Sequence, residues 1–391
     1  MIALDVGLMV VLALALIAGA ARGLLASLGS LIGLALGGLA AWWLMPVVSD
    51  VVPWSDARAA LVVATGAALL VLGTIAGGAV GAALRRRADR TPLRPLDRIL
   101  GGALSLVVAA LSVSLVAQSV ALVGIPGLSA AVSSSQVIRT IDALTPTPIS
   151  SALAQLRQEV LADGLPALGE LIELGPSTST SAAIDLDDPD LDAAADAVGR
   201  VSGTAYACGE TLTGTGFVIA DDRVITNAHV VAGIESPVVE LPGESAAEGT
   251  VVYFDPIDDL AVIAVDTQDA PVLDLSDTLQ AGDSAVIDGY PYGGPFTTVT
   301  AVVRSVGTAN VPDIYDDSSS PREIYALAAT VEPGNSGGPL LTEDGDVAGL
   351  VFARADDGSQ IGYAMTVAEL EPVVAQASAA TAAVSTGECV G

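Results

Sequence analysis

Residues 331–340 read VEPGNSGGPL, and this stretch decides how the C-terminal half of the chain folds. Ser336 stands between Asn335 and a Gly-Gly pair, with Gly334 two positions before it. Small neighbours let a substrate carbonyl come close to a serine, and glycines let backbone N–H groups converge on one point. The stretch therefore predicts an exposed serine nucleophile on a tight turn.

A base for this serine is easy to find, because the chain contains one histidine. That residue, His229, lies in the stretch ITNAHVV at residues 225–231. A serine hydroxyl needs an adjacent base to become nucleophilic, and an imidazole is suited to that role near neutral pH. His229 is therefore the candidate general base.

The base needs an acid partner that orients its ring and stabilises the imidazolium. The stretch DPIDDLAVIAV, residues 255–265, places an acidic turn directly before an apolar strand. Asp259 is favoured because the strand that follows it can hold it in place. Asp258 and Asp255 are the alternatives.

From residue 201 onward, short apolar runs alternate with Gly, Pro and Asp turns. The runs read GTGFVIA, RVITNAHVV, LAVIAV, SAVIDGY, TVTAVVRSV, EIYALAATV, DVAGLVFA and IGYAMTV. Many short strands without helices between them indicate a β-barrel or a β-sandwich.

The order His229, Asp259, Ser336 is similar to that of the chymotrypsin-like (trypsin-like) serine proteases. The pieces GTGFVI, TNAHVV, DDLAV and GNSGGPL resemble the bacterial high-temperature-requirement branch, over roughly residues 198–370. This resemblance implies two six-stranded barrels with the triad in the cleft between them. It also implies that the N–H groups of Gly334 and Ser336 form an oxyanion hole. Asn335 replaces the aspartate that binds a new N-terminus in digestive relatives, so activation by that ion pair is not expected.

The pocket that binds the substrate residue preceding the cleaved peptide bond is expected to be uncharged and to favour an apolar side chain. We expect it to be lined by Thr330, six residues before the serine, and by Leu350, Val351, Phe352 and Ala353. The nearby Asp356 and Asp357 complicate that expectation. One histidine and two cysteines supply no usual zinc site, so neither a metal nor a cofactor is expected.

The two cysteines are Cys208, early in the β-rich part, and Cys389, near the chain's end. Both lie on the oxidising side of the membrane in the topology derived below, which favours a disulfide over two free thiols. The bond would tie the C-terminal tail to the first barrel. We hypothesise that oxidation supports activity by holding the active-site loops in register.

The first third of the chain has a different character, with four apolar runs. They cover residues 2–21, 23–44, 59–84 and 99–123. Each is close to the ~20 residues that a membrane-spanning helix needs. The first run could instead be a signal peptide, but it lacks a basic segment before it and a second run follows at once. We therefore expect a four-helix transmembrane bundle.

Arginines give the orientation of this bundle. Arg22 lies between runs one and two, and six arginines lie at residues 85–98 between runs three and four. The second loop has no basic residue, and Trp42, Trp43 and Trp54 lie in or beside it. The positive-inside rule places the arginines in the cytoplasm, and everything after residue 123 on the extracytoplasmic (periplasmic) side of the inner membrane. Residues 124–391 carry a net charge of −33, which excludes electrostatic binding of nucleic acid.

Two runs carry glycines four residues apart, at positions 29, 33 and 37 and at positions 73, 77 and 81. Such ladders let helices approach closely. Packing within the bundle is favoured, and docking of a membrane partner or a second copy is the alternative. The four spans and basic third loop resemble the colicin V production family. Joined to a protease without a peptide-binding PDZ module, they resemble the actinobacterial membrane-anchored acid-resistance proteases (MarP type).

The expected organisation is a membrane domain at residues 1–123, an extracytoplasmic linker with short helices at 124–196, and a protease domain at 197–391. The linker includes a polar, acidic tether at residues 175–190. We expect a membrane-anchored serine endopeptidase that cleaves envelope or secreted proteins, with a role in acid or stress resistance implied by the resemblance. The competing hypothesis is a membrane scaffold or transport accessory whose protease-like domain binds or senses peptides.

Overall fold

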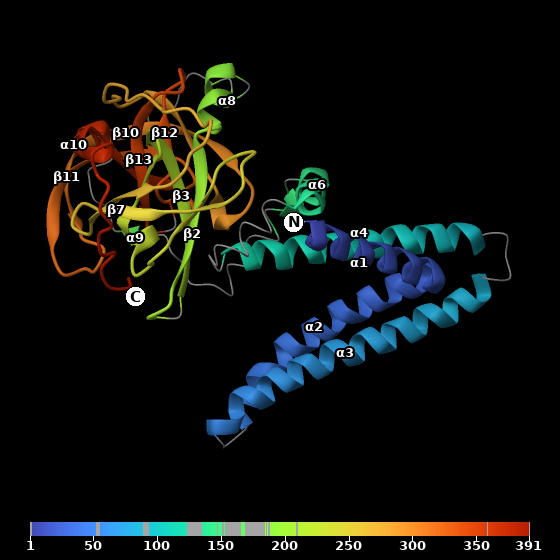
Figure 1. Cartoon of the computed structure of the whole chain (residues 1–391). Coiled ribbons are helices and arrows are strands. Elements are labelled where there is room, and N and C mark those ends of the chain that lie inside the picture. The colour runs from blue at the N-terminus through green and yellow to red at the C-terminus, as the bar shows by residue number, and fades with distance from the viewer. Residues whose placement is uncertain are drawn as a thin grey trace. The chain divides into compact units, whose positions relative to one another are not determined.

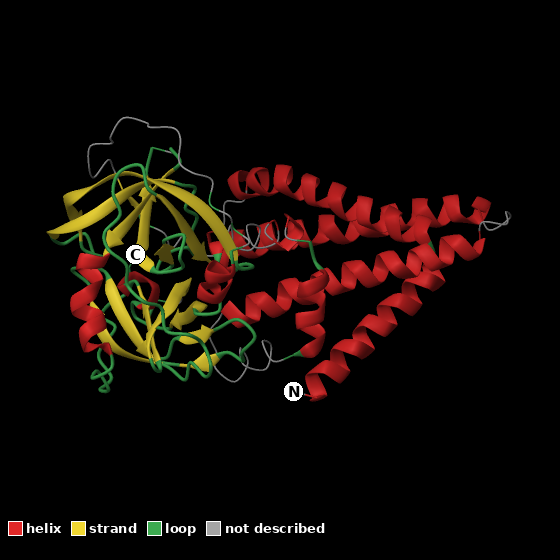
Figure 2. Ribbon diagram, turned by 90° about the horizontal axis from the view of Figure 1, so that it is seen from above, coloured by secondary structure: helices red, strands yellow, loops and turns green. Residues whose placement is uncertain are grey.

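A computed structural model covers the chain and divides it into two compact units, Ile2–Val113 and Ser114–Gly391. The structure describes residues 2–51, 55–88, 94–122, 135–146, 148–150, 152, 166–168, 184, 186, 188–208, 210–357 and 359–390. Trp54 and most of the expected linker, including most of the tether, lie outside the described residues. Long helices make up the first unit, and the β-strands belong to the second (Figures 1 and 2).

Four helices account for the described part of the first third. They are α1 (Ile2–Arg22), α2 (Leu24–Val51), α3 (Ser55–Ala88) and α4 (Arg94–Leu122). Among the described residues, two stretches are long and apolar enough to cross a membrane, Leu4–Arg22 and Pro95–Ala117. The apolar stretches of α2 and α3 are shorter, at Leu24–Ala40 and Val71–Arg85. A helical N-terminal region is confirmed, with two candidate spans rather than the expected four.

The glycine ladders of α2 and α3 face each other. A Cβ added to Gly33 would lie 2.0 Å from the carbonyl oxygen of Gly73, and one added to Gly77 would lie 2.1 Å from that of Gly29. Side chains at these positions would keep the helix backbones apart. The ladders thus pack against each other within the N-terminal unit, in agreement with the favoured interpretation, and docking of a further protein on the ladders stays a prediction.

The C-terminal unit contains two sheets, whose strands are antiparallel except for one two-residue strand in the second sheet. The first has the order β6-β5-β2-β3-β4-β8-β7. Its strands are β2 (Val198–Ala205), β3 (Glu210–Ala220), β4 (Arg223–Thr226), β5 (Val238–Glu240), β6 (Ala247–Glu248), β7 (Thr250–Asp255) and β8 (Leu260–Ala264). A one-turn helix, α9 (Ala228–Val231), follows β4, so the run RVITNAHVV is a strand and then a helix rather than one strand.

The second sheet has the order β1-β13-β12-β9-β10-β11-β14, and β13 also pairs with β14. That extra pairing closes six strands into a ring. The strands are β9 (Ser284–Gly289), β10 (Thr297–Pro312), β11 (Ser319–Ala328), β12 (Pro339–Leu341), β13 (Val347–Ala355) and β14 (Ile361–Thr366). The two-residue strand β1 (Ala167–Leu168) pairs in parallel with the last two residues of β13, Arg354 and Ala355. Each sheet thus has seven strands where six were expected, since short segments add to both.

Four short helices complete the described elements of this unit. They are α6 (Gln136–Leu144), α8 (Pro189–Ala195), the 3₁₀ turn η1 (Pro291–Gly293) and α10 (Val367–Ala377). The helix α8 lies at the end of the linker, where short helices were expected, and Asp188 caps it by accepting a hydrogen bond from the Asp190 N–H.

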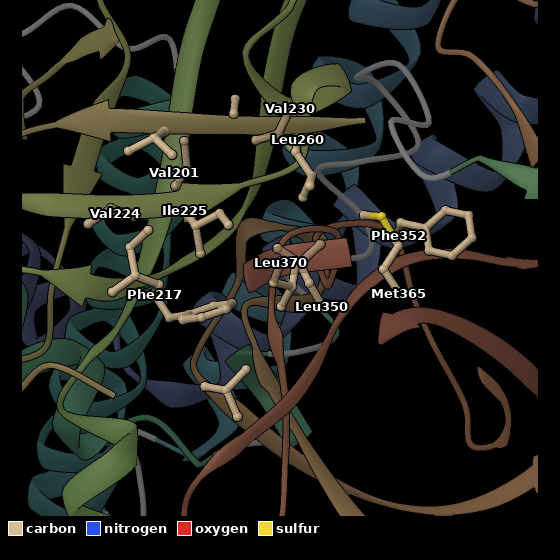
Figure 3. Close-up of a cluster of buried hydrophobic side chains, with 14 of the residues drawn as sticks. Val201, Phe217, Val224, Ile225, Val230, Leu260, Leu350, Phe352, Met365 and Leu370 are labelled. Carbon is tan, nitrogen blue, oxygen red and sulfur yellow. The ribbon is translucent and has the colours of Figure 1, made fainter. Parts of the chain in front are cut away.

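The two sheets share one hydrophobic core. Figure 3 shows Phe217, Ile225 and Leu260 from the first sheet in the same cluster as Leu350 and Met365 from the second. All of these side chains are buried. This shared core fixes the loops of the first sheet against those of the second, and the predicted catalytic residues lie on these loops.

Candidate active site

His229 and Asp259 are brought together by two neighbouring loops of the first sheet. His229 lies on α9, and Asp259 ends the turn between β7 and β8. The imidazole Nδ1 lies 2.9 Å from Asp259 Oδ2 and 3.0 Å from Oδ1. The backbone N–H of His229 also donates to Oδ1, at 3.0 Å. These contacts fix the ring against the carboxylate at the bottom of a buried site, with His229 5% and Asp259 4% exposed.

This geometry decides which ring nitrogen carries the proton. An ionised carboxylate only accepts hydrogen bonds, so Nδ1 must be the protonated nitrogen when the imidazole is neutral. The lone pair is then on Nε2. Among the described residues, Nε2 has no hydrogen-bond partner, although it is buried. The imidazole is therefore set up to take a proton through Nε2.

The other two carboxylates of the acidic turn have different contacts. Asp255 caps the turn by accepting hydrogen bonds from the N–H groups of Ile257, at 2.9 Å, and Asp258, at 3.2 Å. The Asp258 side chain accepts a bond from the Ser320 hydroxyl. Of the three aspartates considered, Asp259 is the one that the structure places on the imidazole.

Ser336 lies in the loop that joins β11 to β12, in the second sheet. Its hydroxyl is buried and has no hydrogen-bond partner within the described part of the chain. The serine is 1% exposed rather than exposed as expected, because its loop is held on two sides. The Gly337 N–H donates to the Val351 carbonyl of β13 at 2.8 Å, and the Ser336 carbonyl accepts from the Thr215 N–H of β3 at 2.8 Å.

Thr215 joins the loop of Ser336 to the first sheet. Its hydroxyl donates to the Gly334 carbonyl at 2.7 Å and accepts from the Tyr290 N–H at 3.0 Å. The preceding residue, Gly214, has no room for a side chain, because a Cβ there would meet Val230 at 2.6 Å and the Ser336 carbonyl at 3.0 Å. Val230 directly follows His229, so Gly214 lies between the histidine helix and the serine loop.

The residues before the serine form a tight turn. Asn335 N–H donates to the Glu332 carbonyl at 3.0 Å, and Gly334 has φ = +96°. Proline at the second position and a glycine with positive φ at the third are typical of a type II turn. The carbonyl of the central peptide, that of Pro333, accepts the Tyr292 N–H at 2.5 Å. In a trans peptide the N–H points opposite to the carbonyl, so the Gly334 N–H points away from Tyr292.

The residues expected to line the specificity pocket lie in two environments. Thr330 is exposed, at the end of β11. The four side chains on β13 are buried: Leu350, Phe352 and Ala353 pack in the core shared by both sheets, and Val351 packs inside the second ring. Strand residues alternate between the two faces of a sheet, which explains why Val351 differs from Leu350 and Phe352. A register shift between Val351 and Ala353 in the pairing with β14 interrupts the alternation, so that Ala353 lies in the same core as Phe352. Because these side chains are packed inside the protein, this part of β13 can contact a substrate only through its backbone.

Cys208 and Cys389 form a disulfide across a sequence separation of 181 residues, as predicted. The tail that carries Cys389 packs directly behind α9. The Gly233 N–H donates to the Thr386 carbonyl at 3.0 Å, and the Thr386 hydroxyl donates to the Ile234 carbonyl at 3.0 Å. The disulfide thus anchors a segment that holds the chain just after His229.

A buried carboxyl group lies close behind the serine loop. Asp288 on β9 is 1% exposed, and burial raises its pKa to about 6, opposed by a hydrogen bond with Thr298. A Cβ on Gly338, two residues after Ser336, would lie 2.4 Å from the Asp288 carbonyl. Among the residues that the structure describes, no group of three or more His, Cys, Asp or Glu side chains could hold a metal ion.

Comparison with known proteins agrees with this arrangement. Residues 214–350 match the trypsin-like peptidase domain, and residues 4–146 match the colicin V production protein family. The serine protease Rv3671c of Mycobacterium tuberculosis (strain H37Rv) is 35% identical over 404 residues, which cover 99% of this chain and 98% of that protein. The chain belongs to this serine protease family.

Other relatives share the protease part alone. The putative serine protease HhoB of a Synechocystis strain is 37% identical over 162 residues, which cover 40% of this chain and 38% of HhoB. The crystal structure of the active form of the Rv3671c protease from M. tuberculosis has a TM-score of 0.52 and 38% identity, and it covers 57% of this chain and all of that one. The chymotrypsin-like β fold and the serine protease activity expected from the sequence are thereby confirmed, and the combination with a colicin V-type region supports a membrane-anchored protease.

Sequence reasoning missed three residues that hold the site. They are Thr215, which binds the serine loop, Tyr292, which binds the turn before the serine, and Arg322, which contacts the turn of Asp259. Thr215 lies within the quoted piece GTGFVI, but nothing in that piece distinguishes it from a surface threonine. Tyr292 and Arg322 lie in segments without a recognisable motif, and their contacts form only in the folded chain.

Proposed function

We propose that this protease is an endopeptidase that cleaves peptide bonds in envelope or secreted proteins through an acyl-enzyme. In this proposal Ser336 is the nucleophile, His229 is the general base and then the general acid, and Asp259 orients the imidazole. The observation that carries the proposal is the Asp259–His229 pair, which leaves the lone pair of the neutral imidazole on Nε2. Both Nε2 and the Ser336 hydroxyl are buried and have no hydrogen-bond partner among the described residues.

Each step uses a group with a defined position. His229 Nε2 takes the proton of the Ser336 hydroxyl as its oxygen attacks the substrate carbonyl, and returns it to the leaving amine. The N–H groups of Gly334 and Ser336 stabilise the oxyanion, and the type II turn sets the direction of the first of them. Each such donor lowers the barrier by roughly 3 kcal/mol in well-studied enzymes. A water molecule then attacks the acyl-enzyme, and His229 takes its proton and returns it to the Ser336 oxygen.

We further propose that four helices cross the inner membrane and place the protease outside the cytoplasm. Two candidate spans, the matching colicin V-type region and the arginines that flank the runs support this topology. Alkaline phosphatase, which is active only outside the cytoplasm, tests it directly. Fusion after residue 122 should give activity and fusion after residue 92 should not. The opposite pattern would refute the orientation. A role in acid or stress resistance stays a prediction from the resemblance.

Hydrolysis by the full-length chain in detergent tests the catalytic proposal. Cleavage of an unfolded protein substrate should be abolished by Ser336→Ala and by His229→Ala. The matched control is Ser276→Ala, which removes a serine hydroxyl that bonds the carbonyls of Asp277 and Val347, apart from the site. Binding of peptides without any cleavage by the intact, oxidised protein would favour the peptide-sensing hypothesis instead.

A further inference from the structure

Arg322 is a buried arginine that contacts the turn of Asp259. It lies on β11 in the second sheet and is 1% exposed. One guanidinium nitrogen donates to the Asp258 carbonyl at 3.2 Å. The other donates to the carbonyls of Val311, at 3.3 Å, and Pro312, at 2.5 Å. The guanidinium carbon lies 5.7 Å from the centre of the Phe352 ring. Burying a charged group is costly, so its contacts call for an explanation.

The first of these contacts acts on the backbone of Asp259. This residue has φ = +55°, a conformation that L-residues rarely adopt. The peptide before its Cα is held by Arg322 through the Asp258 carbonyl. The peptide after it is held by Asn227, whose side chain donates to the Asp259 carbonyl at 2.9 Å. The orientation of these two peptides sets φ and ψ, so the two side chains together fix the direction in which the Asp259 carboxylate points.

The charge of Arg322 acts on the same carboxylate. Burial lowers the pKa of Arg322, and nearby carboxylates oppose that effect, with Asp259 the strongest of them. The ionisable groups that act on the guanidinium from the surrounding elements are Asp255 on β7, Asp258 and Asp259 in the β7–β8 turn and Glu369 on α10, with His229 behind Asp259. Asp255, Asp258 and Glu369 are half-buried and can be solvated, whereas Asp259 is buried.

We infer that Arg322 is a positioning residue of the catalytic site, which fixes the Asp258–Asp259 peptide and supplies the buried positive charge that balances the Asp259 carboxylate. The inference rests on the proposed function, since it concerns the residue assigned to orient His229. It extends that proposal to a residue on the opposite sheet. The β11 strand of the second sheet thereby helps to set the protonation behaviour of a base carried by the first.

The charge has a predictable effect on the imidazole. A positive charge near the Asp259 carboxylate opposes a second positive charge on the neighbouring His229. Removing it should let His229 hold its proton to higher pH. The acid limb of the pH–rate profile should then shift to higher pH, because the deprotonated imidazole is the active form.

Two substitutions separate the charge from the hydrogen bonds. Arg322→Gln removes the charge, whereas Arg322→Lys keeps it but loses the planar fork that reaches three carbonyls. Arg223→Gln is the matched control, because this arginine also binds carbonyls, those of Ala377 and Ala380 at the end of α10, without contacting the β7–β8 turn. Each variant is made in the full-length chain in detergent.

Two readouts apply to each variant. The first is kcat/KM as a function of pH. The second is ¹⁵N NMR of histidine-labelled protein in the Ser336→Ala background, where the one histidine in the chain gives the titration of His229 without overlap. Arg322→Gln should raise the midpoint of both curves by about 0.5–1 pH unit. Arg322→Lys should leave the midpoint in place but lower kcat by about threefold to tenfold, since the carboxylate is held less firmly. Arg223→Gln should change neither.

An unmoved NMR midpoint in Arg322→Gln would overturn the inference, as would an equal shift in Arg223→Gln. If Arg322→Gln does not fold, Arg322→Lys decides: a wild-type kcat or a displaced midpoint would contradict the proposed role. The NMR titration needs no turnover. If the Ser336 assignment is wrong, the wild-type protein will show no activity. If the Arg322 inference is wrong, the protein will be active but the midpoint of the His229 titration will not change in Arg322→Gln.

Discussion

Thr215→Val tests how the first sheet holds the serine loop. Valine keeps the β-branched shape of threonine and thus its preference for a strand, so the change removes the hydroxyl alone. That hydroxyl donates to the Gly334 carbonyl at 2.7 Å and accepts from the Tyr290 N–H at 3.0 Å, at a residue that is fully buried. Each bond lost with its partner left buried costs about 1–3 kcal/mol. The two bonds together give an expected loss of folding free energy of about 2–6 kcal/mol.

The same substitution should also slow catalysis. The Gly334 carbonyl is next to the type II turn that directs the predicted oxyanion donor, so a looser carbonyl means a less ordered donor. If the lost bonds raise the activation free energy by about 1.4–2.8 kcal/mol, kcat decreases about tenfold to a hundredfold. Urea-dependent proteolysis of the β-rich unit in the full-length chain gives the stability, and cleavage of a peptide substrate gives kcat.

Thr213→Val is the matched control on the same strand. Its hydroxyl makes one long bond, 3.3 Å to the Val201 carbonyl, at a half-buried position. We expect a loss of about 0.5 kcal/mol and an unchanged kcat. If the two valine variants differ by less than about 0.5 kcal/mol and have the same kcat, Thr215 does not hold the loop as argued.

Three further predictions concern the acid partner, a buried carboxyl and the disulfide. Asp259→Asn should lower kcat by about 10⁴, the loss known for this change in a well-studied triad, because an asparagine favours the wrong tautomer; a loss under tenfold in steady-state kinetics would argue against this partner. Since the pKa of Asp288 is raised to about 6 in the folded chain, its stabilising contribution is present in acid and lost as pH rises through 6. Asp288→Asn should therefore match wild type in urea unfolding near pH 4 and exceed it by up to about 3 kcal/mol at pH 7, and equal values at pH 7 would contradict the burial argument. Reduction of the Cys208–Cys389 bond should cost at most about 5 kcal/mol of stability and should lower turnover, because the tail behind α9 is released; unchanged turnover after verified reduction would disprove that role.

Much of the β-rich unit could be predicted from the pattern of apolar runs. The runs at β3, β8, β10 and β14 are strands because turn residues bound them and their apolar side chains fill the core. The pattern does not reveal that His229 lies on a one-turn helix, since four residues carry too little periodicity to distinguish a helix from a strand. It also misses β1, whose two residues are a strand only because they lie beside β13.

The candidate site shows the same limit. Motif and spacing led to His229, Asp259 and Ser336, and the structure joins the first two by hydrogen bonds. Motifs do not reveal burial, however: Ser336 is buried in a loop that is bonded to β3 and β13, and the β13 side chains expected in a pocket are packed in hydrophobic clusters. The positions of Thr215 and Arg322 follow from how the sheets pack, and no local pattern encodes that.

Covalent labelling shows whether Ser336 is a nucleophile activated by His229. The intact, oxidised full-length protein is treated with a fluorophosphonate and the modified residue is identified by mass spectrometry. We expect a single label on Ser336, strongly reduced in His229→Ala and absent in Ser336→Ala. An unlabelled wild-type protein that still cleaves its substrate, or a label on a different serine, would contradict it.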